Sequence, residues 1–77
     1  MFDTNKLVKE LNIVCVCVGA NEEKILFEYM SINGRIIGDH MPIIAFFNAE
    51  FPKAIKANKL TAIGGRITID KSKLLIH

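Results

Sequence analysis

The sequence predicts a small α+β domain in which one or two short helices pack against antiparallel meanders, in the order α-β-β-β-α-β-β-β. Three observations predict this fold class. Asn33-Gly34 separates two apolar runs, and this dipeptide tolerates the positive φ angles of a two-residue hairpin turn. Gly64-Gly65 separates two further runs, Leu60–Ile63 and Arg66–Asp70, in the same way. A short helical pattern precedes each of these meanders.

The first predicted elements are a helix and a strand. Asp3 or Thr4 can cap a helix that ends at Leu11. The residues Ile13–Val18 are all apolar and mostly β-branched, which is typical of a strand buried on both faces. We expect this strand to lie beside the strand Lys24–Ile32.

The turn at Asn33-Gly34 sets the register of the first predicted hairpin. In that register Tyr29 faces Gly38, where the aromatic ring would cover the bare backbone of the glycine. Both faces of the ribbon are largely apolar, so we expect both to be covered.

The stretch between the two meanders allows two interpretations. Pro52 cannot lie deep inside a continuous helix. We therefore predict a helix that begins between Asn48 and Phe51 and ends at Asn58, with Met41–Phe47 as an extended or one-turn lead-in. Whether Met41–Phe47 is itself helical stays open, because a proline near the start of a segment also suits a first helical turn.

The last quarter of the chain returns to a strand pattern. Gly64-Gly65 is predicted to be a two-residue turn, in a register that pairs Thr61 with Thr68. A polar turn follows Asp70, and Leu74–Ile76 can form a final short strand.

The size of the chain limits how much apolar surface it can bury. Residues 1–77 form one domain, and a core of this size supplies only about 3–5 kcal/mol of stability. Hydrophobic residues make up 51% of the chain, so we expect the surplus to be buried in a homo-oligomer, most simply a dimer. The sequence shows neither a membrane-spanning run nor a signal-peptide pattern, so we expect a cytoplasmic protein with no membrane partner.

The sequence offers little for catalysis or for metal binding. Cys15 or Cys17 could form a thiol–imidazole pair with His40, and His77 would complete a set of four zinc ligands. However, a single residue separates the cysteines, whereas zinc ligands usually have two to four residues between them. Reactive thiolates also need an electropositive, partly exposed setting. We expect both cysteines to be reduced and buried, and we expect neither an enzyme nor a cofactor nor a metal.

The first functional hypothesis is binding to another protein. We expect a small non-catalytic regulatory or inhibitor-type protein, of the kind that phages and mobile elements use, acting as a homo-oligomer. Aromatic anchors dominate the energetics of protein interfaces, so Phe46, Phe47 and Phe51 are the candidate interface residues. The alternative is that these phenylalanines form the core beneath the sheet.

The second hypothesis is sequence-tolerant nucleic-acid binding by the basic C-terminal half. Residues 1–52 contain four basic and seven acidic residues, whereas residues 53–77 contain six basic residues and one acidic residue. Such an asymmetry is a hint of nucleic-acid binding. The chain has no Trp, one Tyr and two Arg, which leaves little for base stacking or base reading. The candidate phosphate contacts are Lys53, Lys56, Lys59, Arg66, Lys71 and Lys73.

Two stretches resemble parts of nucleic-acid-binding families. FEYMSINGRIIGDH resembles the second and third strands of a double-stranded-RNA-binding domain, but the basic loop and lysine-rich helix start of that family are absent after Gly38. GGRITIDKSKLL resembles a strand and turn of AbrB-type swapped-hairpin DNA-binding domains, which normally have Pro where this chain has Asp70. Each stretch covers less than a quarter of the chain, so we assign the chain to no family.

Overall fold

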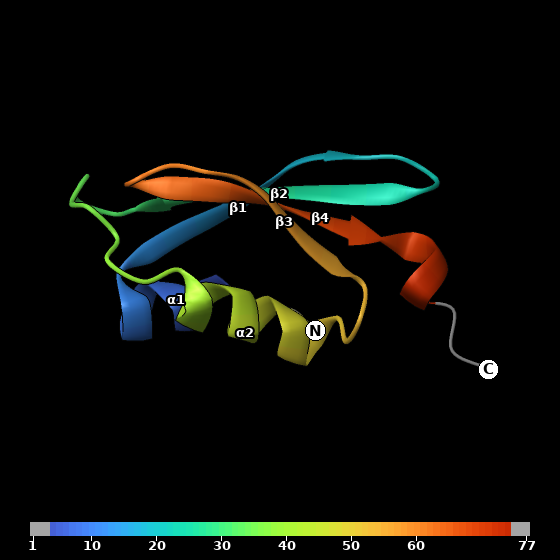
Figure 1. Ribbon diagram of the computed structural model, residues 1–77, viewed down its shortest axis with the longest axis horizontal. Coiled ribbons are helices and arrows are strands. Elements are labelled where there is room, and N and C mark those ends of the chain that lie inside the picture. Colours follow the sequence, from blue (N-terminus) through green and yellow to red (C-terminus); the bar gives the residue numbers. More distant parts are fainter. Residues whose placement is uncertain (1–3, 75–77) are drawn as a thin grey trace.

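The computed structural model describes residues 4–74, which form an α+β domain (Figure 1). Within these residues the order of elements is α-β-β-α-β-β, which confirms the predicted fold class, although no third strand follows β2. The elements are α1 (Thr4–Leu11), β1 (Ile13–Ala20), β2 (Lys24–Ser31), α2 (Met41–Glu50), β3 (Ile55–Leu60), β4 (Gly64–Asp70) and a 3₁₀ helix (Lys71–Leu74).

The strands form one antiparallel sheet in the order β1-β2-β4-β3. Both α-helices lie against the same face of this sheet, and the opposite face carries no helix (Figure 1). The core lies between the helices and the sheet, and its buried hydrophobic residues are Leu7, Ile13, Cys15, Tyr29, Ile43, Phe47, Ala54, Ile67 and Ile69. We call the uncovered side of the sheet the open face.

The first helix and strand form where the sequence predicts them. α1 ends at Leu11, and the positive φ angle of Asn12 (56°) turns the chain into β1. β1 pairs with β2, as expected. The predicted burial of both faces of β1 is wrong, because Ile13 faces the helices while Val16, on the open face, is 52% exposed.

The predicted hairpin at Asn33-Gly34 is wrong, because no strand follows the turn. The side-chain oxygen of Asn33 accepts hydrogen bonds from its own neighbours, and the chain is irregular from there to the start of α2. The second edge of β2 is occupied by β4 instead. Tyr29 does lie opposite a glycine, but that glycine is Gly65 rather than Gly38.

The second helix lies earlier than predicted. α2 spans Met41–Glu50, with Pro42 in its first turn and with Ile43 and Phe47 buried on one side. Pro52 disfavours helical geometry in the residue before it, so the helix stops there. The predicted helix up to Asn58 is therefore wrong, and that part of the chain forms β3.

The second hairpin exists, but its turn lies earlier than predicted. The residues between β3 and β4 make the turn, whereas Gly64 and Gly65 begin β4 and are buried. A β-carbon on Gly64 would overlap the carbonyl oxygen of Tyr29, and one on Gly65 would lie 2.6 Å from the Tyr29 hydroxyl oxygen. Close packing therefore requires both glycines. Leu74 ends the 3₁₀ helix, and the rest of the predicted last strand lies outside the described residues.

The two halves of the domain are related by an offset of 40 residues. Adding 40 to each residue of a β1–β2 pair gives a β3–β4 pair at four positions. Cys15–Tyr29 becomes Ile55–Ile69, Val16–Glu28 becomes Lys56–Thr68, Cys17–Phe27 becomes Ala57–Ile67, and Ala20–Ile25 becomes Leu60–Gly65.

The same offset relates the turns of the two hairpins. The backbone N–H of Asn21 donates to the carbonyl oxygen of Lys24 at 2.9 Å, and that of Thr61 donates to Gly64 at 2.8 Å. In return, the backbone N–H of Lys24 donates to the side-chain oxygen of Asn21, and the backbone N–H of Gly64 donates to the side-chain oxygen of Thr61. Because β2 and β4 are antiparallel neighbours at the centre of the sheet, an approximate two-fold axis perpendicular to the sheet relates the halves. β1 and β3 are therefore equivalent edges of the fold.

Candidate functional site: the open face of the sheet

The open face is built from every second residue of the four strands. Side chains alternate between the two faces of a strand, so the neighbours of core residues such as Tyr29 and Ile67 point away from the helices. The side chains of this face are Val14, Val16, Lys24, Leu26, Glu28, Met30, Lys56, Asn58, Arg66, Thr68 and Asp70.

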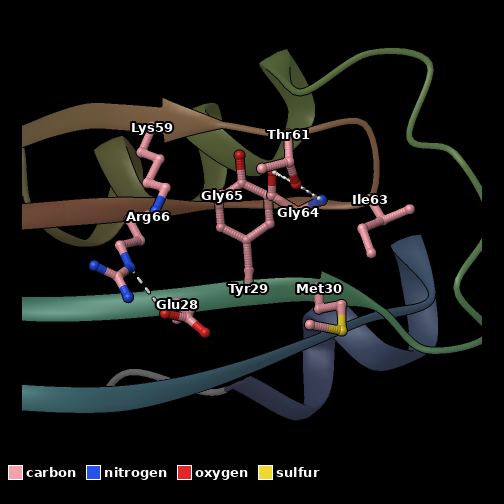
Figure 2. Close-up of a pocket in the computed structure, with 9 residues that line it drawn as sticks. All are labelled: Glu28, Tyr29, Met30, Lys59, Thr61, Ile63, Gly64, Gly65 and Arg66. Atoms are coloured by element: carbon pink, nitrogen blue, oxygen red, sulfur yellow. Dashed lines mark hydrogen bonds and ion pairs between the residues drawn. The ribbon is translucent and has the colours of Figure 1, made fainter.

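One half of the open face is apolar. Val14, Val16 and Met30 are 40%, 52% and 49% exposed, and the nearby Ile32 and Ile63 are 52% and 37% exposed. A hollow of about 210 Å³ lies beside Met30 and over Gly64. Figure 2 shows the charged residues at one end of this hollow and the apolar residues at the other. The hollow therefore offers an apolar surface with polar groups beside it.

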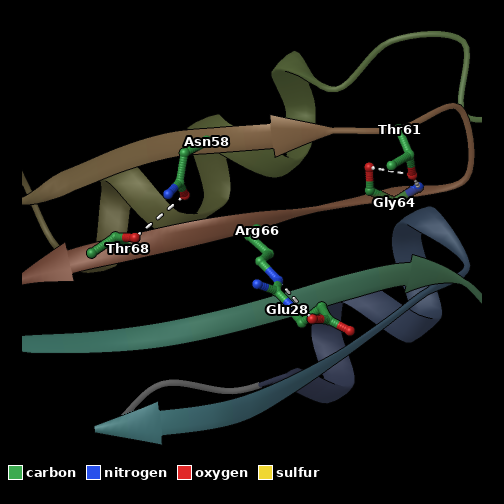
Figure 3. A network of polar contacts seen from close by, with 6 residues as sticks. All are labelled: Glu28, Asn58, Thr61, Gly64, Arg66 and Thr68. Atoms are coloured by element: carbon green, nitrogen blue, oxygen red, sulfur yellow. Dashed lines mark hydrogen bonds and ion pairs between the residues drawn. The ribbon is translucent and has the colours of Figure 1, made fainter. Parts of the chain in front are cut away.

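The other half of the open face is polar. The Arg66 side chain donates to Glu28 at 2.9 Å, and the Thr68 hydroxyl donates to Asn58 at 3.3 Å (Figure 3). An exposed ion pair of this kind contributes only about 0–1 kcal/mol to stability. Its main effect is that the charge of Arg66 is already neutralised by a neighbouring strand.

Four lysines gather at one end of the polar half, around a hollow of about 400 Å³. They come from β2, from the turn before β3, from β3 and from the 3₁₀ helix: Lys24, Lys53, Lys56 and Lys73. One carboxylate, that of Asp70, lies among them. Hydrogen bonds from the side chain and the backbone of Ser72 lower the pKa of Asp70, and the charges of Lys73 and Lys24 lower it further. Asp70 is therefore ionised at neutral pH, and the cluster has a net positive charge.

The predicted phosphate contacts do not form one stripe. Lys53, Lys56 and Lys73 come together in the cluster just described, whereas Lys59 and Arg66 line the hollow beside Met30. The other candidate, Lys71, is half-buried, and its backbone N–H donates to the backbone carbonyl oxygen of Glu23 at 2.8 Å. Sequence reasoning missed Lys24, because this residue belongs to the acidic half of the chain and joins the cluster only through the pairing of β2 with β4.

The three phenylalanines predicted as interface residues lie in or against the core. Phe47 is fully buried, and Phe46 and Phe51 are half-buried and pack against the core residues. The rings of Phe27 and Phe47 lie 5.4 Å apart between the sheet and α2. A fully buried Phe47 offers no surface to a partner, so the open face is the better candidate for an interface.

The cysteines differ in their surroundings, although neither forms a disulfide. Cys15 is buried, and this burial, together with the nearby Cys17, raises the pKa of its thiol to about 12. Cys17 is exposed, so its predicted burial is wrong. The ring of His40 is hydrogen-bonded through Nδ1 to the Tyr29 hydroxyl at 2.8 Å. Within residues 4–74 no three potential ligands cluster as a metal site would require, and His77 lies outside the described residues.

No family model matches the chain, and no curated protein or solved structure gives a significant match. Among residues 4–74, no helix has the length and the apolar character needed to cross a membrane.

Proposed function

We propose that this chain is a small non-catalytic protein that acts by binding another protein, as a homo-oligomer, through the apolar half of its open face. The observation that carries the proposal is the exposed apolar surface around Met30, which faces away from the helices. Large exposed apolar patches with a polar rim mark interaction sites on protein surfaces. Regulatory proteins and inhibitors of this type need only such a surface on a compact scaffold.

The charges beside this surface indicate the chemistry of the partner. Lys59 lies at the hollow next to Met30, and the lysine cluster lies further along the same face. A partner that presents apolar side chains flanked by carboxylates would complement both features. We therefore propose a protein partner with an acidic rim around an apolar patch.

The contacts among the described residues also favour binding over catalysis. A catalytic hydroxyl must lie beside a base and be reachable by the substrate. Between residues 4 and 74, the hydroxyl–imidazole contact is that of Tyr29 with His40, and Tyr29 is only 1% exposed. Burial also keeps the thiol of Cys15 protonated.

The proposal is tested by retention of host proteins on the immobilised chain after nuclease treatment. We expect wild type to retain a discrete acidic protein and the variant Met30→Glu to lose it, because a carboxylate at this position repels an acidic rim and removes apolar contact. Ala49→Glu is the matched control, since Ala49 is exposed on α2 on the other side of the sheet. Equal retention by Met30→Glu and wild type would refute docking on the open face.

A second candidate function is sequence-tolerant nucleic-acid binding, supported by the lysine cluster. Four lysines converge on one hollow, which suits a run of phosphates. The rings of Phe27 and Tyr29 face the helices, so the open face has no aromatic platform for bases. Retention of nucleic acid at low salt, lost in the double variant Lys53→Glu/Lys56→Glu, would place this function ahead of protein binding.

A further inference from the structure

The two edges of the sheet occupy equivalent positions in the fold but differ in chemistry. Exposed edge strands can pair with other chains, and proteins commonly protect them with lysines, prolines and bulges. Each edge strand has a bulge, but β3 has two further protections, since Pro52 precedes it and it contains Lys56 and Lys59. β1 contains no charged residue and no proline over its eight residues, IVCVCVGA. Position in the sheet does not explain this difference, because the 40-residue offset gives the two edges equivalent pairings.

The register shows which backbone groups point outward from β1. The backbone N–H of Ile32 donates to the carbonyl oxygen of Asn12, and residues that bond to a given neighbour alternate along an antiparallel strand. The backbone N–H and C=O groups of Asn12, Val14 and Val16 therefore point towards β2. The residues whose backbone N–H and C=O groups point to the free edge are Ile13, Cys15 and Cys17.

The same reasoning identifies the outward groups of β3. The backbone N–H of Asp70 donates to the carbonyl oxygen of Ala54, so Ile55 and Ala57 direct their backbone groups away from β4. Ile55 and Ala57 correspond to Cys15 and Cys17 by the 40-residue offset. The two edges thus provide an internal comparison, residue by residue.

We propose that β1 pairs antiparallel with β1 of a second copy of this chain, which joins two four-stranded sheets into one sheet of eight strands. This inference rests on the homo-oligomer of the proposed function and specifies its interface. It does not depend on which partner binds the open face.

A second copy fits this edge because the strand is compatible with itself. An uncharged strand that pairs with its own copy brings no like charges together, whereas pairing of β3 with β3 would oppose lysines. Pairing of β1 with β3 of the next copy would be heterologous and would give a ring or an open filament. The lysines of β3 and the proline before it disfavour that arrangement, so assembly stops at a two-fold dimer.

The regular part of β1 also fixes the register of the proposed dimer. The pairing with β2 is regular from Ile13 to Cys17, and the register shifts after Cys17. A two-fold axis at Cys15 uses all three outward residues and places Val14 opposite Val16 of the partner subunit. Because this axis is perpendicular to the sheet, both open faces lie on the same side. The exposed valines of the two copies then form one continuous apolar surface.

Hydrogen exchange of the wild-type protein tests the proposal without any substitution. In a dimer through β1, the backbone N–H groups of Ile13, Cys15 and Cys17 are bonded, so they should exchange at least about tenfold more slowly than those of Ile55 and Ala57. Measurement by NMR at micromolar to millimolar concentration compares the two edges within one sample. Equal exchange at the two edges, whether fast or slow, overturns the proposal.

A matched pair of proline variants tests it by mass. Cys17→Pro removes an outward N–H of β1 and Ala57→Pro removes the equivalent N–H of β3, and neither N–H serves the pairing inside the sheet. Light scattering should give twice 8.6 kDa for wild type and for Ala57→Pro, and 8.6 kDa for Cys17→Pro.

The outcomes separate this inference from the proposed function. A wild-type dimer that Cys17→Pro leaves intact overturns the β1 interface but keeps the homo-oligomer. A monomeric wild type overturns both, while docking on the open face is still decided by Met30→Glu. If Cys17→Pro does not fold, as circular dichroism would show, hydrogen exchange of the wild type decides.

Discussion

Replacing Gly64 by alanine should strongly destabilise this domain, and the structure gives the magnitude. A methyl group at this position would overlap the carbonyl oxygen of Tyr29 and would approach the α-carbon of Met30 at 3.2 Å. Both obstacles are backbone atoms of the central strand β2, so no side chain can rotate away. Overpacking of a filled site costs about 1–3 kcal/mol. Displacing the β2–β4 pairing adds about 0.5–1.5 kcal/mol for each hydrogen bond lost.

With one hydrogen bond lost, these costs sum to about 1.5–4.5 kcal/mol, a large part of the roughly 3–5 kcal/mol that a core of this size supplies. Urea denaturation followed by circular dichroism, at one fixed protein concentration, measures the change. Gly38→Ala is the control, because a β-carbon there meets nothing within 4 Å, and it should change stability by less than about 0.5 kcal/mol.

A third variant separates the packing role of Gly64 from a turn role. Asn tolerates the positive φ angles of hairpin turns, so a turn glycine would accept Gly64→Asn. Inside β4 the Asn side chain meets the same backbone as alanine and should be at least as destabilising. The reasoning is refuted if either Gly64 variant unfolds within about 0.5 kcal/mol of wild type.

Four further predictions concern the core, the cysteines and the lysine cluster. Tyr29→Phe removes the buried hydroxyl that bonds to the imidazole at the start of α2, and it should lower the free energy of unfolding in urea by about 0.5–1.5 kcal/mol. Iodoacetamide should modify Cys17 roughly tenfold faster than Cys15, as peptide mass mapping would show. Burial raises the pKa of Cys15 from 9.0 to about 12, so the unfolded chain loses this proton first, and stability should fall as the pH rises from about 9 towards 12 in alkaline melts. Lys53→Glu/Lys56→Glu should change stability by less than about 0.5 kcal/mol in urea melts while abolishing any retention of nucleic acid at low salt.

The parts of the fold that depend on local sequence were predictable. The first helix and the pairing of β1 with β2 follow from apolar patterns over a few residues. The neighbour on the other side of β2 was not predictable in this way. Two segments could pair with that edge of β2, namely the residues after Asn33-Gly34 and those of β4. Only the packing of side chains decides between them. The glycines of β4 fit beneath Tyr29, whereas Ile36 is left 77% exposed.

The candidate site was less predictable than the fold, because it depends on strands that are distant in sequence. Counting charges by halves of the chain assigned Lys24 to the acidic half, yet the pairing of β2 with β4 brings it to Lys53 and Lys73. Phe47 is an aromatic residue of the type that anchors interfaces, but it is buried in the core. The open face itself was hidden because Ile13–Val18 is apolar throughout, so no alternation marked an exposed side.

The internal two-fold relation separates residues whose character the fold requires from residues whose character it leaves free. On the helix side the related positions are apolar in both halves, as for Leu7 with Phe47 and Phe27 with Ile67. On the open face some related positions differ, because an apolar residue of the first half has a charged counterpart, whereas Glu28 and Thr68 are polar in both halves. The pairs that differ are Val16 with Lys56, Leu26 with Arg66 and Met30 with Asp70. The fold requires the apolar character of the first set but not the difference within the second. A partner that contacts apolar and cationic groups at once would use that difference, so the asymmetry of the open face favours protein binding over contacts with phosphates alone.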